Sequence, residues 1–147
     1  MYINTSRFGQ ISIVAEDVII FPKGVVGFED CRHWIVLASE EGNSVGWLQS
    51  VSQPTVALPV ISPRRIDPGY EIKLAQEDLD DLSLSSPSLA YTLVVLSRHE
   101  ETQLSANLRA PVLINLDDRL GKQVITLNRQ PLQRIVLPLS EEWKRAA

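Results

Sequence analysis

Short apolar runs recur along the whole chain, and turn-forming residues separate each run from the next. The runs are rich in β-branched and aromatic residues, and Gly, Pro, Asn, Asp or Ser lies between them, which is typical of strands joined by turns. The expected strands are 11–15, 18–21, 34–38, 45–51, 56–61, 70–74, 89–97, 104–108, 112–116, 123–127 and 134–137. This pattern predicts an all-β protein.

Two of these runs differ in their expected burial. Apolar and charged residues alternate along residues 70–74, so one face of that strand should meet the core and the other should meet water. Residues 93–96 are apolar on both faces, which indicates a central strand covered by a second layer.

Helix is expected in few places. Residues 77–82 can form one or two turns with acids near the helix N-terminus, and residues 140–143 resemble a capped helix start. Residues 117–121 predict a hairpin loop, and prolines at the ends of runs favour bent strands. We expect one domain over residues 1–147, a partly open β-barrel or a sandwich of bent antiparallel strands with one or two short helices.

Composition is that of an ordinary globular protein. The chain has 147 residues, 44% of them hydrophobic, with a net charge of −4. A single cysteine, Cys31, cannot form an internal disulfide, and no apolar run approaches the roughly 20 residues that a membrane helix needs. No secretory signal is recognisable at the N-terminus, so we expect a cytoplasmic protein with no membrane partner.

Acidic residues concentrate between positions 67 and 81. That stretch holds six acids against one base, Lys73. The acids are Asp67, Glu71, Glu77, Asp78, Asp80 and Asp81. Such a surface would attract a basic partner and repel phosphate, although a short acidic run is often only a solvated face. Bases downstream of Leu120 have no aromatic residues between them, so direct nucleic-acid binding is not expected.

Several short patterns could suggest catalysis or metal binding, but the residues around each of them argue against it. Residues 42–46 read Gly-Asn-Ser-Val-Gly, but a strand follows them where a nucleophile elbow needs a helix, and only His99 could serve Ser44 as a base. Cys31 and His33 have no third group to orient the imidazole, and two histidines without ligand spacing disfavour a metal site. The acid pairs 80–81 and 117–118 lack an EF-hand or glycine-rich frame. We therefore expect no catalytic, cofactor-binding or metal-binding residues.

Residues 21–30 form the most distinctive segment, Phe-Pro-Lys-Gly-Val-Val-Gly-Phe-Glu-Asp. Pro22 restricts φ, and Gly24 and Gly27 permit positive φ, while four large apolar side chains interleave with them. This composition predicts a loop held in one shape, either as a buried connection or as a binding element.

This segment resembles a signature of the FliW family of flagellar assembly factors. Three further blocks resemble that family in the same order: Trp-Leu-Gln-Ser at 47–50, Ala-Asn-Leu-Arg-Ala-Pro at 106–111 with Ile-Asn at 114–115, and Gly-Lys-Gln-Val-Ile at 121–125. The resemblance covers about residues 3–127. The C-terminal strand and tail, about 128–147, have no clear counterpart.

The resemblance implies a non-enzymatic protein that binds the RNA-binding regulator CsrA and also binds flagellin, so that it relieves CsrA repression of flagellin synthesis until flagellin occupies it. We expect the acidic stretch to attract CsrA, and reversing Glu71, Asp78 and Asp81 to Lys should slow association. A flagellin segment could pair along a strand edge or lie beside the 21–30 loop. The partner-binding candidates are Phe28, Glu29, Asp30, Gln49, Asp67, Glu71, Asp78, Asp81 and Asn107.

Alternatives remain at this point. The amides of Gln49, Asn107 and Asn115, and the aromatic rings of Phe28, Trp34 and Trp47, could serve the core instead of a partner. The protein could also be an adaptor or chaperone for another polymer subunit on the same fold, or a small serine hydrolase using Ser44 and His99.

Overall fold

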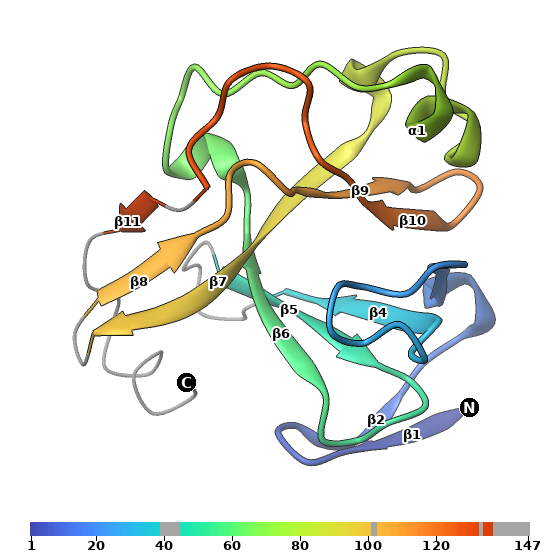
Figure 1. Ribbon diagram of the computed structural model, residues 1–147. Coiled ribbons are helices and arrows are strands. Elements are labelled where there is room, and N and C mark those ends of the chain that lie inside the picture. The colour runs from blue at the N-terminus through green and yellow to red at the C-terminus, as the bar shows by residue number, and fades with distance from the viewer. Residues whose placement is uncertain (39–44, 101–102, 133, 137–147) are drawn as a thin grey trace.

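The computed structural model describes residues 1–38, 45–100, 103–132 and 134–136 (Figure 1). The strands are β1 (Tyr2–Thr5), β2 (Gly9–Ser12), β3 (Ile19–Ile20), β4 (His33–Leu37), β5 (Val45–Ser50), β6 (Ala57–Ile61), β7 (Tyr91–Glu100), β8 (Gln103–Ala106), β9 (Val112–Asn115), β10 (Leu120–Gln123) and β11 (Arg134–Val136). The helices are α1 (Gln76–Asp81) and three 3-10 turns, η1 (Ala15–Asp17), η2 (Pro63–Arg65) and η3 (Pro87–Leu89).

Seven strands close into a barrel in the order β6-β5-β4-β3-β10-β9-β7, and β7 pairs back with β6. Strand β7 is long enough to serve two sheets: its first residues pair with β9, and its last residues leave the barrel and pair with β8, which pairs with β11. Strands β1 and β2 form a separate hairpin below the barrel in Figure 1. The expected all-β barrel with a short helix is confirmed.

One pairing departs from the antiparallel expectation. Strand β10 runs parallel to β3, with Leu120 opposite Ile20. Tight turns between consecutive runs indicate antiparallel hairpins, whereas β3 and β10 come from distant parts of the chain and no turn relates them. A hairpin joins β9 and β10 as expected, but its loop was expected at 117–121, whereas Leu120 and Gly121 already belong to β10.

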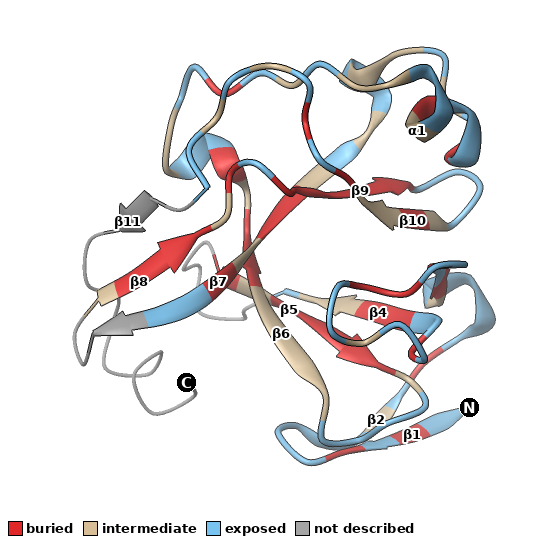
Figure 2. Cartoon of the chain, in the orientation of Figure 1, coloured by how far each residue is buried: buried red, intermediate tan, exposed pale blue. Residues whose placement is uncertain are grey.

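Two apolar clusters lie on the two faces of β7, as the two-sided run at residues 93–96 predicted. Leu93 belongs to the barrel core, with Phe21, Trp34 and Leu48. Val94 and Leu96 belong to a second cluster, which the segment between β6 and α1 and strand β8 help to cover. Red segments of β7 in Figure 2 mark buried residues of this strand, which include Leu93, Val94 and Leu96.

The strand expected at residues 70–74 is not formed. The alternation of burial is as expected, since Tyr70 is buried while Glu71 and Lys73 are exposed. The backbone there bonds to side chains instead of to a neighbouring strand: Asn128 Nδ2 donates to the Glu71 carbonyl at 2.7 Å, and Asn128 Oδ1 accepts from the Lys73 N–H at 2.8 Å. One backbone bond remains, from the Leu127 N–H to the Lys73 carbonyl at 2.7 Å, and side-chain amides take the place of the others.

Strand boundaries also differ from the expected ones. The strand expected at 11–15 is β2 at Gly9–Ser12, and Ala15 begins the 3-10 turn η1. The run expected at 123–127 is irregular, and the strand β10 ends at Gln123, where that run was expected to begin. Val124 and Thr126 still donate to the carbonyls of Pro111 and Arg109. Strand β1 was not expected, because its short run alternates weakly and gains its pairing only from β2.

The helix expected at residues 77–82 is confirmed as α1. The helix expected at residues 140–143 lies outside the described residues. Within the described part of the chain, no helix has the length and apolar character that crossing a membrane requires.

Candidate partner-binding site

The 21–30 loop is held in one shape by its own backbone. Gly24 and Gly27 have φ of 67° and 89°, a region that glycine enters without strain. A Cβ at Gly24 would lie 2.5 Å from the Cα of Glu29, so the two arms of the loop approach each other too closely for any side chain there. The N–H of Phe28 donates to the Val25 carbonyl at 2.7 Å, which closes the tip.

Aromatic contacts fix this loop to the barrel core. Phe21 is fully buried and its ring occupies the space over Gly121 of β10, where any Cβ would collide with it. Phe28 is half-buried and packs edge-on against Trp34, with ring centroids 6.4 Å apart. The indole N–H of Trp34 donates to the Cys31 carbonyl at 2.8 Å, which ties the end of the loop to the same ring. Trp34 is therefore a core residue, and Phe28 lies at the boundary between core and surface.

Gln123 joins the loop to a second signature block. Its Oε1 accepts from the Val26 N–H at 3.0 Å, and its Nε2 donates to the Ala110 carbonyl at 3.0 Å. The Val26 side chain next to this bond is 75% exposed. One amide thus spans residues 21–30 and 106–111, and it holds an apolar side chain out toward solvent.

Helix α1 is attached to the same corner by a group of four charges that we call the lysine clasp: Lys122, Asp78, Asp81 and Lys23. Lys122 Nζ lies 2.7 Å from Asp78 Oδ1 and 2.7 Å from Asp81 Oδ2. Lys23 Nζ, on the loop, lies 3.4 Å from Asp81 Oδ2. The side chains of Lys122 and Asp78 are only 15% and 16% exposed, so this pair is largely removed from water.

The clasp shifts the ionisation of its members in opposite directions. The hydrogen bond from Lys122 lowers the pKa of the Asp81 carboxyl. Burial opposes the charged form of Lys122, but its hydrogen bonds to Asp78 and Asp81 outweigh that effect, and the pKa of Lys122 is raised. Asp81 and Lys122 therefore both favour their charged forms in the folded protein.

The other acidic candidates occupy less constrained positions. Glu71 and Glu77 are exposed, and Asp67 accepts from the Gly69 N–H at 3.1 Å within its own turn. Glu29 accepts from the Gly27 N–H at 3.1 Å, a bond that lowers the pKa of the Glu29 carboxyl. Asp30 is exposed beside it.

The polar candidates of the signature blocks are engaged inside the protein. Gln49 is fully buried; its Nε2 donates to the Ser50 carbonyl at 2.9 Å and to the Val56 carbonyl at 3.1 Å. Asn107 Oδ1 accepts from the N–H groups of Arg109 and Ala110 and shapes that turn. The amide of Asn115 donates to the Leu82 carbonyl at 2.8 Å, which holds the end of α1 on the β9–β10 hairpin.

The structure therefore brings some of the predicted residues together. Asp81 of α1 meets the 21–30 loop through Lys23, and Asp78 shares Lys122 with Asp81. Gln49, by contrast, lies in the interior, and Asn107 is half-buried in its own turn. Sequence reasoning missed Lys122 and Gln123, which organise this corner. Both lie in the 121–125 block, and the approach of Gly121 to Phe21 explains why a glycine precedes them.

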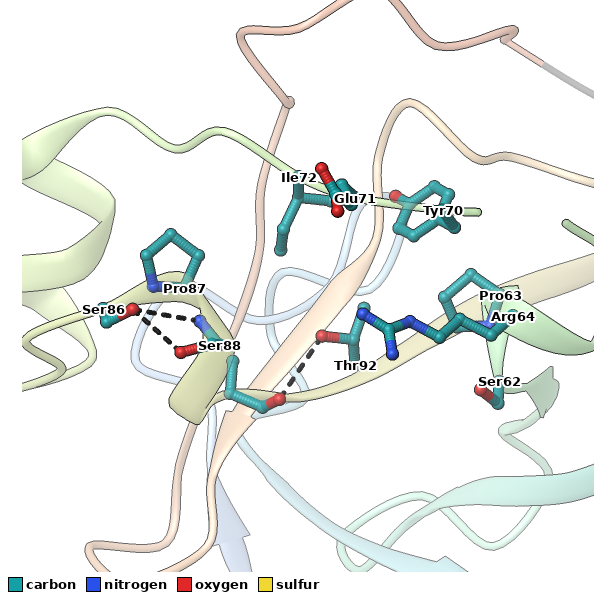
Figure 3. Close-up of a pocket in the computed structure, with 11 residues that line it drawn as sticks. Ser62, Pro63, Arg64, Tyr70, Glu71, Ile72, Ser86, Pro87, Ser88 and Thr92 are labelled. Carbon is teal, nitrogen blue, oxygen red and sulfur yellow. Dashed lines mark hydrogen bonds between the residues drawn. The ribbon is translucent and has the colours of Figure 1, made fainter. Parts of the chain in front are cut away.

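A groove of about 520 Å³ adjoins the acidic stretch, between η2, η3 and the start of β7. Arg64 and Glu71 line it together with Tyr70 and the hydroxyls of Ser86 and Ser88 (Figure 3). The Tyr70 hydroxyl donates to the Leu108 carbonyl at 2.6 Å, and burial raises the pKa of Tyr70 to about 12. Tyr70 is thus a structural hydrogen-bond donor.

The candidate catalytic groups do not form a described site. Ser44 and the side chain of His99 lie outside the described residues, and β5 begins at Val45, directly after that serine. Cys31 is buried whereas His33 is exposed. Among the residues that the structure describes, no three His, Cys, Asp or Glu side chains are placed to hold a metal ion.

Comparison with known proteins gives the class of this barrel. The family model described as "FliW protein" matches residues 2–135. Flagellar assembly factor FliW of Clostridium tetani is 34% identical over 143 residues, covering 97% of each chain. The FliW of Caldanaerobacter subterraneus is 36% identical over 149 residues, covering 99% of this chain and 97% of that protein.

A solved structure, the crystal structure of the flagellar assembly factor FliW, superposes with a TM-score of 0.80 at 31% identity and covers 95% of both chains. The fold is thus that of a flagellar assembly factor. The chain belongs to the FliW family, a family that is named for assembly and not for catalysis.

Proposed function

We propose that this protein is a non-enzymatic flagellar assembly factor of the cytoplasm that binds a CsrA-type translational regulator and, in competition with it, flagellin. Family membership over nearly the full length supports this proposal. The observation that carries it is the corner where an ordered loop, β10 and an acidic helix are fixed together by Gln123 and the lysine clasp. A rigid corner of this kind suits binding, because little conformational freedom is lost when a partner docks.

Competition between two partners would make the protein a switch. When flagellin is scarce, the factor binds the regulator and relieves repression of flagellin synthesis. When flagellin accumulates, it occupies the factor and the regulator is released. The free concentration of each partner then sets the occupancy of the other, and no covalent step is needed.

The structure divides the acidic candidates into two groups. Asp78 and Asp81 already pair with Lys122 and Lys23, so reversing both to Lys would place four cations together and disturb the fold. Glu71 and Glu77 are exposed and hold no ion pair among the described residues, so their charge remains available to a basic partner. We therefore assign the electrostatic attraction of the regulator chiefly to Glu71 and Glu77, with Glu29 and Asp30 on the neighbouring loop.

The test is the double variant Glu71→Gln and Glu77→Gln, compared with Asn4→Lys and Gln10→Lys. Both variants raise the net charge equally, and Asn4 and Gln10 lie exposed on the β1–β2 hairpin, at the opposite end of the molecule from α1 (Figure 1). Association with purified CsrA should slow several-fold at low salt for the first variant only, and the difference should shrink as salt rises. Equal rates for both variants would remove the assignment.

Titration of the wild-type protein with CsrA and flagellin, singly and together, tests the function itself. Binding of each partner, with displacement of one by the other, is the expected result. Binding of flagellin without any binding of CsrA would leave an adaptor or chaperone, and binding of neither would contradict the proposal.

A further inference from the structure

The barrel wall has few paired positions at one place, where the short strand β3 lies between β4 and β10. Strand β3 pairs with β4 only opposite Trp34 and His33. The next residues of β4, 35–37, pair with β5 on one side and with no strand of the described chain on the other. Strand β3 also has only one paired position with β10. Part of β4 therefore presents an open edge.

A groove of about 460 Å³ runs along this open edge, and we call it the seam groove. It is lined by residues of β2, η1, β4, the start of β7 and the end of β9. Its members are Ile11, Ser12, Ile13, Glu16, Asp17, Ile19, Ile35, Val36, Leu37, Tyr91, Ile114, Leu116 and Arg119. Nine of these thirteen side chains are aliphatic or aromatic, so the groove is mainly apolar.

The floor of the groove is formed by residues of the barrel core. Ile19 and Ile114 are core residues, and Val36 packs against the same cluster. At the rim, Leu116 is 60% exposed and Tyr91 is 41% exposed. Apolar side chains thus continue from the core to the surface at the point where backbone pairing stops. A segment that adds to a sheet needs both features, backbone groups to pair with and pockets for alternate side chains.

The rim of the groove carries more negative than positive charge. Glu16 and Asp17 contribute two carboxylates, while Arg119 is the single base lining the groove. The Arg119 guanidinium donates to the Ala15 carbonyl at 2.8 Å, which commits part of it to holding η1. The rim is therefore net acidic and complements a segment that carries a lysine or arginine beside its apolar residues.

We propose that the seam groove binds an extended, mainly apolar segment with a basic flank, contributed by flagellin, which pairs along residues 35–37 of β4 as an added strand. The choice of flagellin as the source rests on the function proposed above. About three paired residues would span roughly 10 Å of strand, and the alternate side chains of the segment would pack between Tyr91 and Leu116.

The test compares Leu116→Glu with Leu132→Glu. The two leucines are 60% and 62% exposed, so both substitutions should be tolerated by the fold, and only Leu116 lines the groove. We expect Leu116→Glu to weaken flagellin binding by about tenfold or more and to leave CsrA binding unchanged, with Leu132→Glu close to wild type for both. Equal flagellin affinity for the two variants would overturn the inference.

Hydrogen exchange on the wild-type protein supplies a second measurement that needs no variant. Flagellin should slow exchange at the Val36 amide, because residues 35 and 37 already point their N–H groups toward β5 and only Val36 faces the open edge, whereas CsrA should not. Protection by flagellin elsewhere, with unchanged exchange at this edge, would contradict the proposal. Failure of the wild-type protein to bind flagellin would instead remove the proposed function on which this inference rests.

Discussion

Two corners of this barrel hold their strands in opposite ways. At the corner of the 21–30 loop, β10 and α1, side chains connect every element: Phe21 fills the space over Gly121, Gln123 spans two loops, and Lys122 binds two carboxylates. At the seam groove, residues 35–37 of β4 have no strand partner on one side within the described chain, and apolar side chains face an open space of about 460 Å³.

This difference indicates which of the two surfaces already has partners for its polar and charged groups within the protein itself. The lysine clasp satisfies its own charges, so only the outward acids of that corner remain for long-range attraction. The seam groove leaves one edge of β4 without a strand partner from the described chain, and the side chains of Leu116 and Tyr91 exposed at its rim. These are the groups that gain most when another polypeptide covers them. The exposed acids of the first corner thus suit long-range attraction of a charged partner, and the open edge of the second corner suits binding of an extended polypeptide segment.

The largest expected effect comes from Gly121→Ala. A methyl group there would occupy the position of the Phe21 ring, so the loop and β10 would have to separate. We expect a loss of about 3 kcal/mol in the free energy of unfolding, measured by chemical denaturation. Gly69→Ala is the control, because its Cβ would make only ordinary contact, 3.7 Å from Asp67 Oδ1. Equal stability of the two variants would show that the loop is not packed against β10.

Lys122→Met should have the next largest effect, because it leaves Asp78 largely buried without its cation. The expected loss is about 2 kcal/mol of unfolding free energy. Lys23→Met removes the exposed member of the clasp, 67% exposed and 3.4 Å from its partner, and should change stability little. Similar losses for both lysines would mean that the clasp acts as an exposed network.

The cost of Lys122→Met should also depend on pH. The pKa of Asp81 is lowered in the folded state, so its contribution is present above the unfolded value of about 3.9 and is lost as pH falls through the folded value. The stability difference between wild type and Lys122→Met should therefore shrink below about pH 4. Thermal unfolding of both proteins from pH 7 to pH 3 measures this, and a constant difference would contradict it.

Gln123→Ala should cost about 1 kcal/mol, because it removes bonds to Val26 and Ala110 at a partly exposed site. Hydrogen exchange should show faster exchange of the Val26 amide. The same substitution at the exposed Gln10 provides the baseline.

The smallest change in stability is expected at the seam groove. Leu116→Glu, at the rim of the seam groove, should change unfolding free energy by less than about 0.5 kcal/mol, since its side chain already meets water. A large loss would indicate that the groove is part of the core, and the contrast between the two corners would fail.

Local patterns predicted much of this fold because strands and hairpins depend on near neighbours. The two-sided run at 93–96, the hairpin after β9 and the helix at 77–82 each follow from spacing within a few residues. The strand expected at residues 70–74 failed for the converse reason. Its alternation was real, but its hydrogen bonds came from residues 127–130, more than fifty positions away, and not from a neighbouring strand.

The site was predicted less completely than the fold. The 21–30 loop was recognisable from its glycines, its proline and its apolar residues, and the acids of α1 from their density. That Asp78 and Asp81 are bound by Lys122 could not be read from the chain, because 44 and 41 positions separate those residues from their lysine. Burial of Gln49 was equally invisible, since an amide amid apolar neighbours is compatible with either the interior or an interface.

By itself, the sequence determined that the chain forms short strands with one acidic helix, that its 21–30 loop has a single shape, and that it belongs with the FliW family. Only the tertiary structure decided that β3 and β10 run parallel, that a lysine neutralises part of the acidic helix, and that β4 keeps an open edge. Strand propensity, turn geometry and charge density are properties of neighbouring residues, whereas pairing direction, ion pairs and open edges depend on which distant segments meet.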